Sequence, residues 1–182
     1  MGEPMKRSPY RQEDRLARII AAIQIMAIAP WATGSLDSRI RELEGAEEVG
    51  DDRERGPAGA EALEKWRPVF EQHPEFFKVY TFEKEERVAL RWRFAQFVNY
   101  DPTNATVLPQ DKIDAMSEKE RYRRLTRQPL SAEQIGVLIK TAIDMHSQAI
   151  AETQASVRYV PLIAAFLGAA GGFIAAVIGK GH

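Results

Sequence analysis

A tract near the C-terminus places the strongest constraint on what this chain can fold into. Residues 160–179 carry no charge and no strongly polar side chain. A helix rises about 1.5 Å per residue, so a tract of this length would cross a hydrocarbon core of roughly 30 Å. Arg158 and Tyr159 precede it and Lys180 and His182 follow it, and such side chains anchor helices at membrane interfaces. We therefore expect 160–179 to form a single transmembrane helix rather than the buried helix of a soluble core.

Small residues repeat inside this tract. Ala164, Gly168, Gly172 and Ala176 recur every four residues and would give the helix one smooth face. Membrane helices with such a face approach one another closely and associate through packing. The sequence therefore predicts a homodimer or a higher oligomer. The alternative stays open, because Gly and Ala are frequent in membrane helices for other reasons.

The position of the tract predicts where the rest of the chain lies. Only residues 180–182 follow it, and the charged N-terminus has no apolar run of the kind that a secretory signal peptide needs. Moving a few residues across a bilayer is easier than moving a whole polar domain. We expect a tail-anchored, single-pass protein of the inner (plasma) membrane, with membrane lipid as one partner and the bulk of the chain in the cytoplasm. The absence of cysteine suits that reducing compartment.

Three helices and a β-hairpin are predicted over residues 11–98. Apolar residues recur at helical spacing from about 11 to 29, and Ser35 is placed to cap a short helix that ends at Gly45. A third helix over 60–73 ends where His73 precedes a proline.

The hairpin consists of EFFKVYTF and RVALRWRF, which alternate in polarity on either side of a charged turn. The second of these strands would direct Val88, Leu90, Trp92 and Phe94 into the core. Its opposite face would expose Arg87, Arg91 and Arg93 to solvent.

This order of elements resembles a winged-helix domain, with 60–73 in the place of the third helix and 76–94 as the wing. The stretches EKWRPVFEQHPEFFKVY and TAIDMHSQAI are also similar to small, uncharacterised bacterial proteins that pair such a domain with a C-terminal membrane helix. The resemblance implies a mainly α fold with one β-hairpin, and it implies no particular activity.

The remaining segments are polar or amphipathic. Residues 46–59 hold many charges and almost nothing to bury, which predicts a mobile acidic loop. Residues 99–130 are polar and interrupted by prolines, which predicts a connector with one short helix over about 117–126. Ser131 and Gln134 form a capping box.

The capping box would begin a long amphipathic helix over 131–159 that continues into the transmembrane helix. We expect its apolar side to pack on the winged-helix-like body or on a second copy of the chain. That side holds Ile135, Leu138, Ile139, Ala142, Met145, Ala149 and Ile150.

The sequence offers no constellation typical of an enzyme. His73, His146 and His182 are scattered, without the spacing of a metal site, and no glycine-rich phosphate loop or nucleophile elbow is present. We expect a protein with no catalytic residues, no metal and no cofactor.

The charges predict a protein partner more than a nucleic-acid partner. Lys and Arg number 25 against 26 Asp and Glu, so no global field attracts an anion. The third helix carries Glu61, Glu64 and Glu71 against Lys65 and Arg67, which is a poor surface for phosphates. Candidates for contact with anionic lipid or nucleic acid are Arg87, Arg91, Arg93, Lys119, Arg121, Arg123, Arg124 and Arg127.

We therefore expect the cytoplasmic domain to be an adaptor or sensor that binds an unknown protein. Two alternatives remain open at this point. One is a membrane-tethered DNA-binding regulator, and the other is a membrane-disrupting effector that acts through the Gly/Ala-rich helix.

Overall fold

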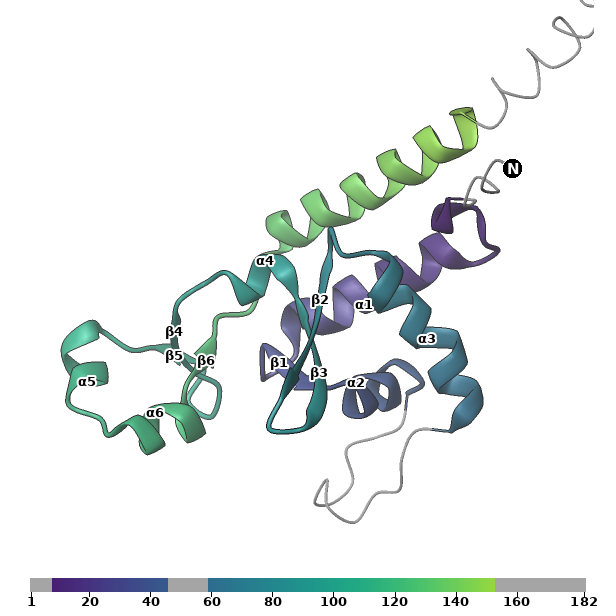
Figure 1. Ribbon diagram of the computed structural model, residues 1–182. Helices are drawn as coiled ribbons and strands as arrows, with labels where there is room; N and C mark the ends of the chain where they lie inside the picture. The colour runs from purple at the N-terminus through teal and green to yellow at the C-terminus, as the bar shows by residue number, and fades with distance from the viewer. Residues whose placement is uncertain (1–7, 46–58, 153–182) are drawn as a thin grey trace, which may run out of the picture. The chain divides into compact units, whose positions relative to one another are not determined.

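The computed structural model describes residues 8–45 and 59–152 (Figure 1). These residues belong to two compact units, one spanning 12–142 and the other combining 8–11 with 143–152. Among them, no helix is both long enough and apolar enough to span a membrane. The predicted mobile loop at 46–59, apart from residue 59, and the predicted transmembrane helix at 160–179 lie outside the described residues, as do Ala164, Gly168, Gly172 and Ala176.

The larger unit begins with the predicted three helices and hairpin, so this part of the prediction is confirmed. An extra short strand, which the sequence did not predict, follows the first helix. The elements are α1 (Arg15–Ile28), β1 (Thr33–Ser35), α2 (Leu36–Leu43), α3 (Ala60–Gln72), β2 (Phe77–Phe82) and β3 (Glu85–Leu90).

Local contacts explain where α2 begins and ends and where α3 ends. The Ser35 hydroxyl accepts a hydrogen bond from the Ser38 backbone N–H at 3.1 Å, as the sequence predicts for the start of α2. Gly45 then adopts a left-handed φ of 75° just past the end of α2. His73 ends α3, and its carbonyl accepts the N–H groups of Phe76 and Phe77 at 3.0 Å each, which turns the chain directly into β2.

The core of this unit lies between the three helices and one face of the first sheet. Phe70 of α3 meets Phe77 of β2 edge to face, with ring centroids 5.2 Å apart. Buried apolar side chains of α1 and α2 complete the core. Removing these side chains from water drives the packing of the three helices on the hairpin. The principal members are Ile19, Ile23, Met26, Leu36, Ile40, Val69, Val88 and Leu90.

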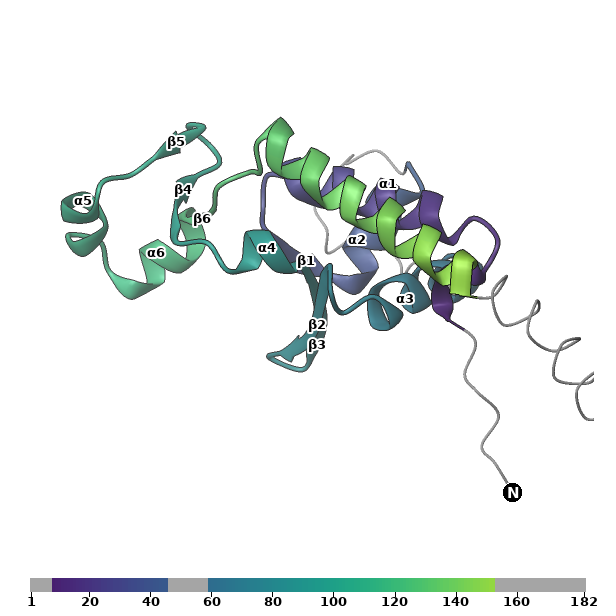
Figure 2. The same cartoon turned by 90° about the horizontal axis from the view of Figure 1, so that it is seen from above.

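The first sheet is antiparallel, in the order β1-β3-β2, so β2 forms one edge. Val79 lies opposite Val88 on the face toward the core. The other face of the hairpin, here called the outer face, carries the alternate residues. Its members are Lys78, Tyr80 and Phe82 on β2, opposite Ala89, Arg87 and Glu85 on β3. In Figure 2 the hairpin projects clear of the helices.

The prediction that the second strand continues to Phe94 is wrong. The strand ends at Leu90, and α4 (Arg91–Phe94) follows it. The backbone N–H of Arg91 donates to the carbonyl of Phe76 at 2.7 Å, and this bond holds the chain where β3 ends and α4 begins. The pattern of alternation is therefore broken, and Trp92 is 38% exposed while Arg93 is fully buried.

The prediction of only one β-hairpin is also wrong, because residues 99–130 contain part of a second antiparallel sheet, in the order β5-β4-β6. Both views place this sheet and its helices on the far side of the first sheet from α3 (Figures 1 and 2). The helix predicted near 117–126 is present as α6. The elements are β4 (Val98–Asp101), β5 (Thr106–Val107), α5 (Gln110–Asp114), α6 (Glu118–Arg124) and β6 (Thr126–Arg127).

Asp101 holds the second sheet together. Its buried carboxylate accepts hydrogen bonds from the N–H groups of Thr103 and Asn104 and from the Arg124 guanidinium at 2.8 Å. The Arg124 bond, followed by the Asn104 amide, lowers the pKa of this carboxyl to about 2. The Asp-Pro-Thr-Asn sequence is a turn that closes on its own aspartate, and Arg124 ties that turn to α6.

A long helix follows the second sheet and is described over 132–152. Its predicted capping box is confirmed, since the Ser131 N–H donates to Gln134 Oε1 at 2.9 Å and the Gln134 N–H donates to Ser131 Oγ at 3.2 Å. In the smaller unit, a short 3-10 turn, η1 (Pro9–Arg11), meets this helix where the Tyr10 hydroxyl donates to Met145 Sδ.

The burial of His73 predicts that the stability of the fold depends on pH. Its ring is fully buried, and Nδ1 lies 3.0 Å from Glu75 Oε1. Burial lowers the pKa of the imidazole, Glu75 acts in the opposite direction and Arg15 lowers the pKa further. The unfolded chain, with a histidine pKa of about 6.5, therefore binds more protons than the folded chain just below that pH.

We expect the free energy of unfolding to rise with pH up to about 6.5 and to level off above it. Urea unfolding of the wild type and of His73→Asn at about pH 5 and about pH 7.5 checks this sign. The wild type should gain stability relative to the variant as the pH rises. A difference that stays constant across this range would show that His73 does not carry the effect.

Candidate functional site

A groove with a volume of about 1270 Å³ opens in the larger unit. Its lining comes from β1, α2 and α3, from the first residues of β3, and from β4, α5, α6 and β6. Elements far apart in the sequence therefore meet around one recess. Charged side chains of both signs line it, among them Asp37, Arg41, Glu85, Arg87 and Arg127.

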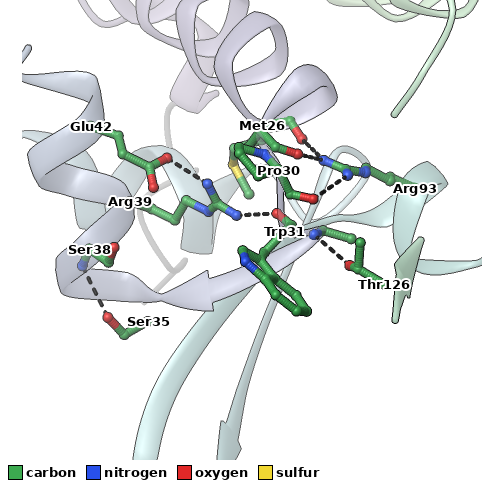
Figure 3. Close-up of polar contacts among 11 residues, drawn as sticks. Met26, Pro30, Trp31, Ser35, Ser38, Arg39, Glu42, Arg93 and Thr126 are labelled. Carbon is green, nitrogen blue, oxygen red and sulfur yellow. Dashed lines mark hydrogen bonds and ion pairs between the residues drawn. The ribbon is translucent and has the colours of Figure 1, made fainter. Parts of the chain in front are cut away.

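Arg39 organises one wall of the groove (Figure 3). Its guanidinium donates to Glu42 Oε2 at 2.5 Å and to the carbonyl of Trp31. Gly34 lies against this side chain, and a Cβ at Gly34 would come within 2.9 Å of Arg39 Nε. Glycine at this position therefore leaves room for a buried arginine that sets the positions of Trp31 and α2.

Arg93 joins this wall to the second sheet. The prediction that Arg93 is exposed to solvent is wrong. The side chain is fully buried, so it does not offer its charge to lipid or nucleic acid. Its guanidinium donates to five backbone carbonyls, those of Met26, Ala29, Pro30, Arg127 and Gln128, at 2.7–3.4 Å; Figure 3 shows the α1 side. Burial, and then the charge of Arg39, lower the pKa of Arg93 to about 10.

Most cations of the groove are already paired with carboxylates. Arg41 donates to Asp37 at 2.6 Å, and Arg87 lies 3.4 Å from Glu85. Arg67 donates through both terminal nitrogens to Glu86, at 3.0 and 2.7 Å. The groove therefore presents a mixed, largely neutralised surface rather than a basic channel.

Exposed apolar side chains stand among these charges. Trp31 is 42% exposed, Val98 is 43% exposed and Tyr122 is 62% exposed, and all three line the groove. The Tyr122 ring lies 6.2 Å from that of Phe82 near the tip of the hairpin. Aromatic residues with one apolar face and one polar end are enriched where proteins bind other proteins. Tyr122 is not among the residues predicted to bind a partner. In the sequence it stands out only as the single aromatic residue within the charged run of α6.

The structure divides the remaining predicted basic residues into two groups. Arg121 and Arg124 are partly exposed but bonded within the domain, Arg121 to the carbonyls of Asp114 and Met116 and Arg124 to Asp101. The other group keeps its charge at the surface. It consists of Arg91, Lys119 and Arg123, all exposed, of which Arg91 also donates to the carbonyl of Pro74.

Helix α3 does not present a free basic surface in the described part of the chain. Lys65 lies 2.6 Å from Glu44, and Arg67 is bound to Glu86 and Glu71. Glu61 and Glu64 remain exposed on the same helix. This arrangement agrees with the weak attraction for phosphate that the sequence predicts for this helix.

Within residues 8–45 and 59–152, no three His, Cys, Asp or Glu side chains gather closely enough to hold a metal ion. Comparison of the chain with protein-family models, curated proteins and solved structures finds no match. The groove and its charges are therefore the features of the described chain that indicate a function.

Proposed function

We propose that this chain is a membrane-anchored adaptor or sensor whose winged-helix-like domain binds a protein partner in the groove. The order of three helices and a hairpin supports the resemblance to winged-helix domains. The observation that carries the proposal is the groove itself, which combines exposed aromatic side chains with charges of both signs.

The chemistry of the groove favours a polypeptide as its ligand. Protein interfaces combine aromatic and arginine side chains with polar groups, whereas nucleic-acid sites need many free cations along a groove. Here Arg39, Arg41 and Arg67 are bound to carboxylates of the same domain. A duplex or single strand would therefore find few cations able to contact its phosphates.

The proposed anchor is the uncharged tract 160–179. Its length, the residues that flank it and its repeat of small residues support insertion in the inner membrane and self-association there. The groove would then face the cytoplasm, where an anchored domain meets its partners at a high effective concentration.

Site-specific photo-crosslinking in intact cells tests the proposed function. A benzoyl-phenylalanine at position 122, in the groove, should form adducts that protease destroys and nuclease leaves intact. The matched control places the benzoyl-phenylalanine at position 24, where Gln24 of α1 is exposed and outside the groove lining. This control should give about tenfold less adduct, because hot-spot contacts cluster at the centre of an interface.

Two results would contradict this proposal. Nuclease-sensitive adducts from position 122 would favour the membrane-tethered DNA-binding regulator. Equal adduct yields from positions 122 and 24 would show that the groove has no specific role in binding.

A further inference from the structure

A cluster of cations and aromatic rings lies on the outer face of the hairpin, next to the groove. Lys78 Nζ is 3.8 Å from the centroid of the Phe94 ring, and the Arg127 guanidinium carbon is 4.3 Å from the same centroid. The ring centroids of Tyr80 and Phe94 are 5.6 Å apart. Arg87 lies opposite Tyr80 on the neighbouring strand. Arg87 and Arg127 also line the groove, so the two features are continuous.

This cluster has more positive than negative charge. Among the described residues, neither Lys78 nor Arg127 has a carboxylate in ion-pair contact, and only Glu85 accompanies Arg87 at 3.4 Å. The charge of buried Arg93 also interacts unfavourably with that of Arg127. Cations held close together in a partly buried place are stabilised by an anion, and the aromatic rings fix them in position for one.

The open edge of β2 provides a second, independent feature. Strand β2 pairs only with β3 in the described chain, so one row of its backbone groups has no strand partner. In a hairpin with a two-residue turn, the residues that flank the turn, here Phe82 and Glu85, form a hydrogen-bonded pair. Along the strands, non-hydrogen-bonded and hydrogen-bonded pairs then alternate. The N–H groups of Val79 and Thr81 therefore point outward along the edge, while that of Phe77 donates to the His73 carbonyl at the start of the strand.

We propose that an acidic, extended segment of a partner protein adds to the edge of β2 and places its carboxylates against Lys78 and Arg127. This inference rests on the proposed function and names both the surface and the chemistry of the partner. Backbone hydrogen bonds hold the added strand, and alternate side chains of that strand reach the outer face. The carboxylates on that face meet the two cations that lack an acidic partner.

The same features argue against the two other anionic polymers. Lys78 and Arg127 are only partly exposed, so a flat lipid headgroup layer or a wide duplex has less access to them than a single extended chain. Neither lipid nor nucleic acid carries the backbone N–H and C=O groups that complete a β-sheet edge. A peptide uses both features at once.

Fluorescence anisotropy with the full chain in non-ionic detergent micelles tests the inference. The probe is a labelled Glu-Thr repeat of about eight residues, long enough for one strand, and a Gln-Thr repeat is its neutral counterpart. We expect the acidic probe to bind at low salt and the neutral probe to bind at least about tenfold more weakly.

Three variants separate a specific site from general attraction. Lys78→Gln with Arg127→Gln should weaken binding of the acidic probe by about tenfold or more, because both charge contacts are lost. Lys119→Gln with Arg123→Gln removes the same charge from α6 and should change binding by less than about twofold. Thr81→Pro removes an outward N–H and should weaken both probes while the hairpin persists, since proline is tolerated on an edge strand.

The inference would be overturned if the two double variants lost the same affinity for the acidic probe. It would also be overturned if phosphatidylglycerol vesicles or a single-stranded oligonucleotide bound at Lys78 and Arg127 more strongly than the acidic probe does. Circular dichroism of each variant checks that the fold is retained, and a misfolded double variant leaves Thr81→Pro and the neutral probe to decide. If position 122 captures a protein in cells but the acidic probe does not bind, the proposed function stands and this inference fails.

Discussion

Replacing Arg93 with methionine is expected to lower the free energy of unfolding by about 3–5 kcal/mol, which is a large part of the stability of an ordinary domain. Methionine fills much of the same space but donates no hydrogen bond. Five carbonyls that Arg93 now satisfies would lose their donor. Each buried carbonyl without a partner costs about 1–3 kcal/mol, reduced where water can enter.

The geometry of the guanidinium makes lysine a poor substitute as well. Arginine presents five donors in a fixed planar fork, whereas lysine has three donors on one nitrogen. A lysine at position 93 cannot reach the end of α1 and the two carbonyls of β6 and its successor together. We expect Arg93→Lys to lose about 2 kcal/mol or more, because at least two carbonyls remain unsatisfied.

Urea unfolding of the full chain, followed by tryptophan fluorescence, measures these losses. Arg91→Met is the matched control, since Arg91 belongs to the same short helix but is exposed and donates only to the carbonyl of Pro74 from its side chain. It should lose no more than about 1 kcal/mol. If Arg93→Met proved as stable as Arg91→Met, the network around Arg93 would not hold the second sheet to the helices.

The burial of Arg93 also shows which kind of contact cannot be predicted from the sequence, and why. Its position in an alternating segment predicted exposure, because alternation describes only the two faces of a local strand. The decisive partners are the carbonyls at the end of α1, more than 60 residues earlier in the chain. The need of a helix terminus for donors is visible in the sequence, but the identity of a distant donor is not.

Local signals performed better because their physical cause is local. The caps at Ser35 and Ser131 depend on side chains and N–H groups three residues apart. The end of α3 depends on the proline after His73. The second sheet had a usable local signal in the Asp-Pro turn at Asp101, yet its strands are too short to show a period.

The groove and the cationic cluster could not be predicted from sequence. Lys78, Phe94 and Arg127 belong to three separate elements, and only the fold brings them together. Charge composition alone predicted neutrality for the chain as a whole. The local excess of positive charge arises because some arginines find carboxylates in the fold, as Arg67 does, while Arg127 packs on a ring.

The proposed anchor leads to the second large effect. Replacing Gly168 and Gly172 together with arginine is expected to move the chain from the membrane to the aqueous fraction. An arginine at the centre of a membrane helix costs about 2.5–3.5 kcal/mol by insertion measurements, so two near the centre of 160–179 cost about 5–7 kcal/mol. Such a penalty reduces the inserted population by several orders of magnitude.

Sedimentation of membranes after alkaline extraction measures the change, with the full chain in the pellet and the arginine variant in the supernatant. Gly168→Leu with Gly172→Leu is the control, because leucine favours the bilayer but fills the smooth face that close helix packing requires. This control should remain in the pellet and yield fewer crosslinked dimers. A wild-type chain that stays in the supernatant without detergent would show that 160–179 packs in water, and both the anchor and the self-association that depends on it would then be excluded.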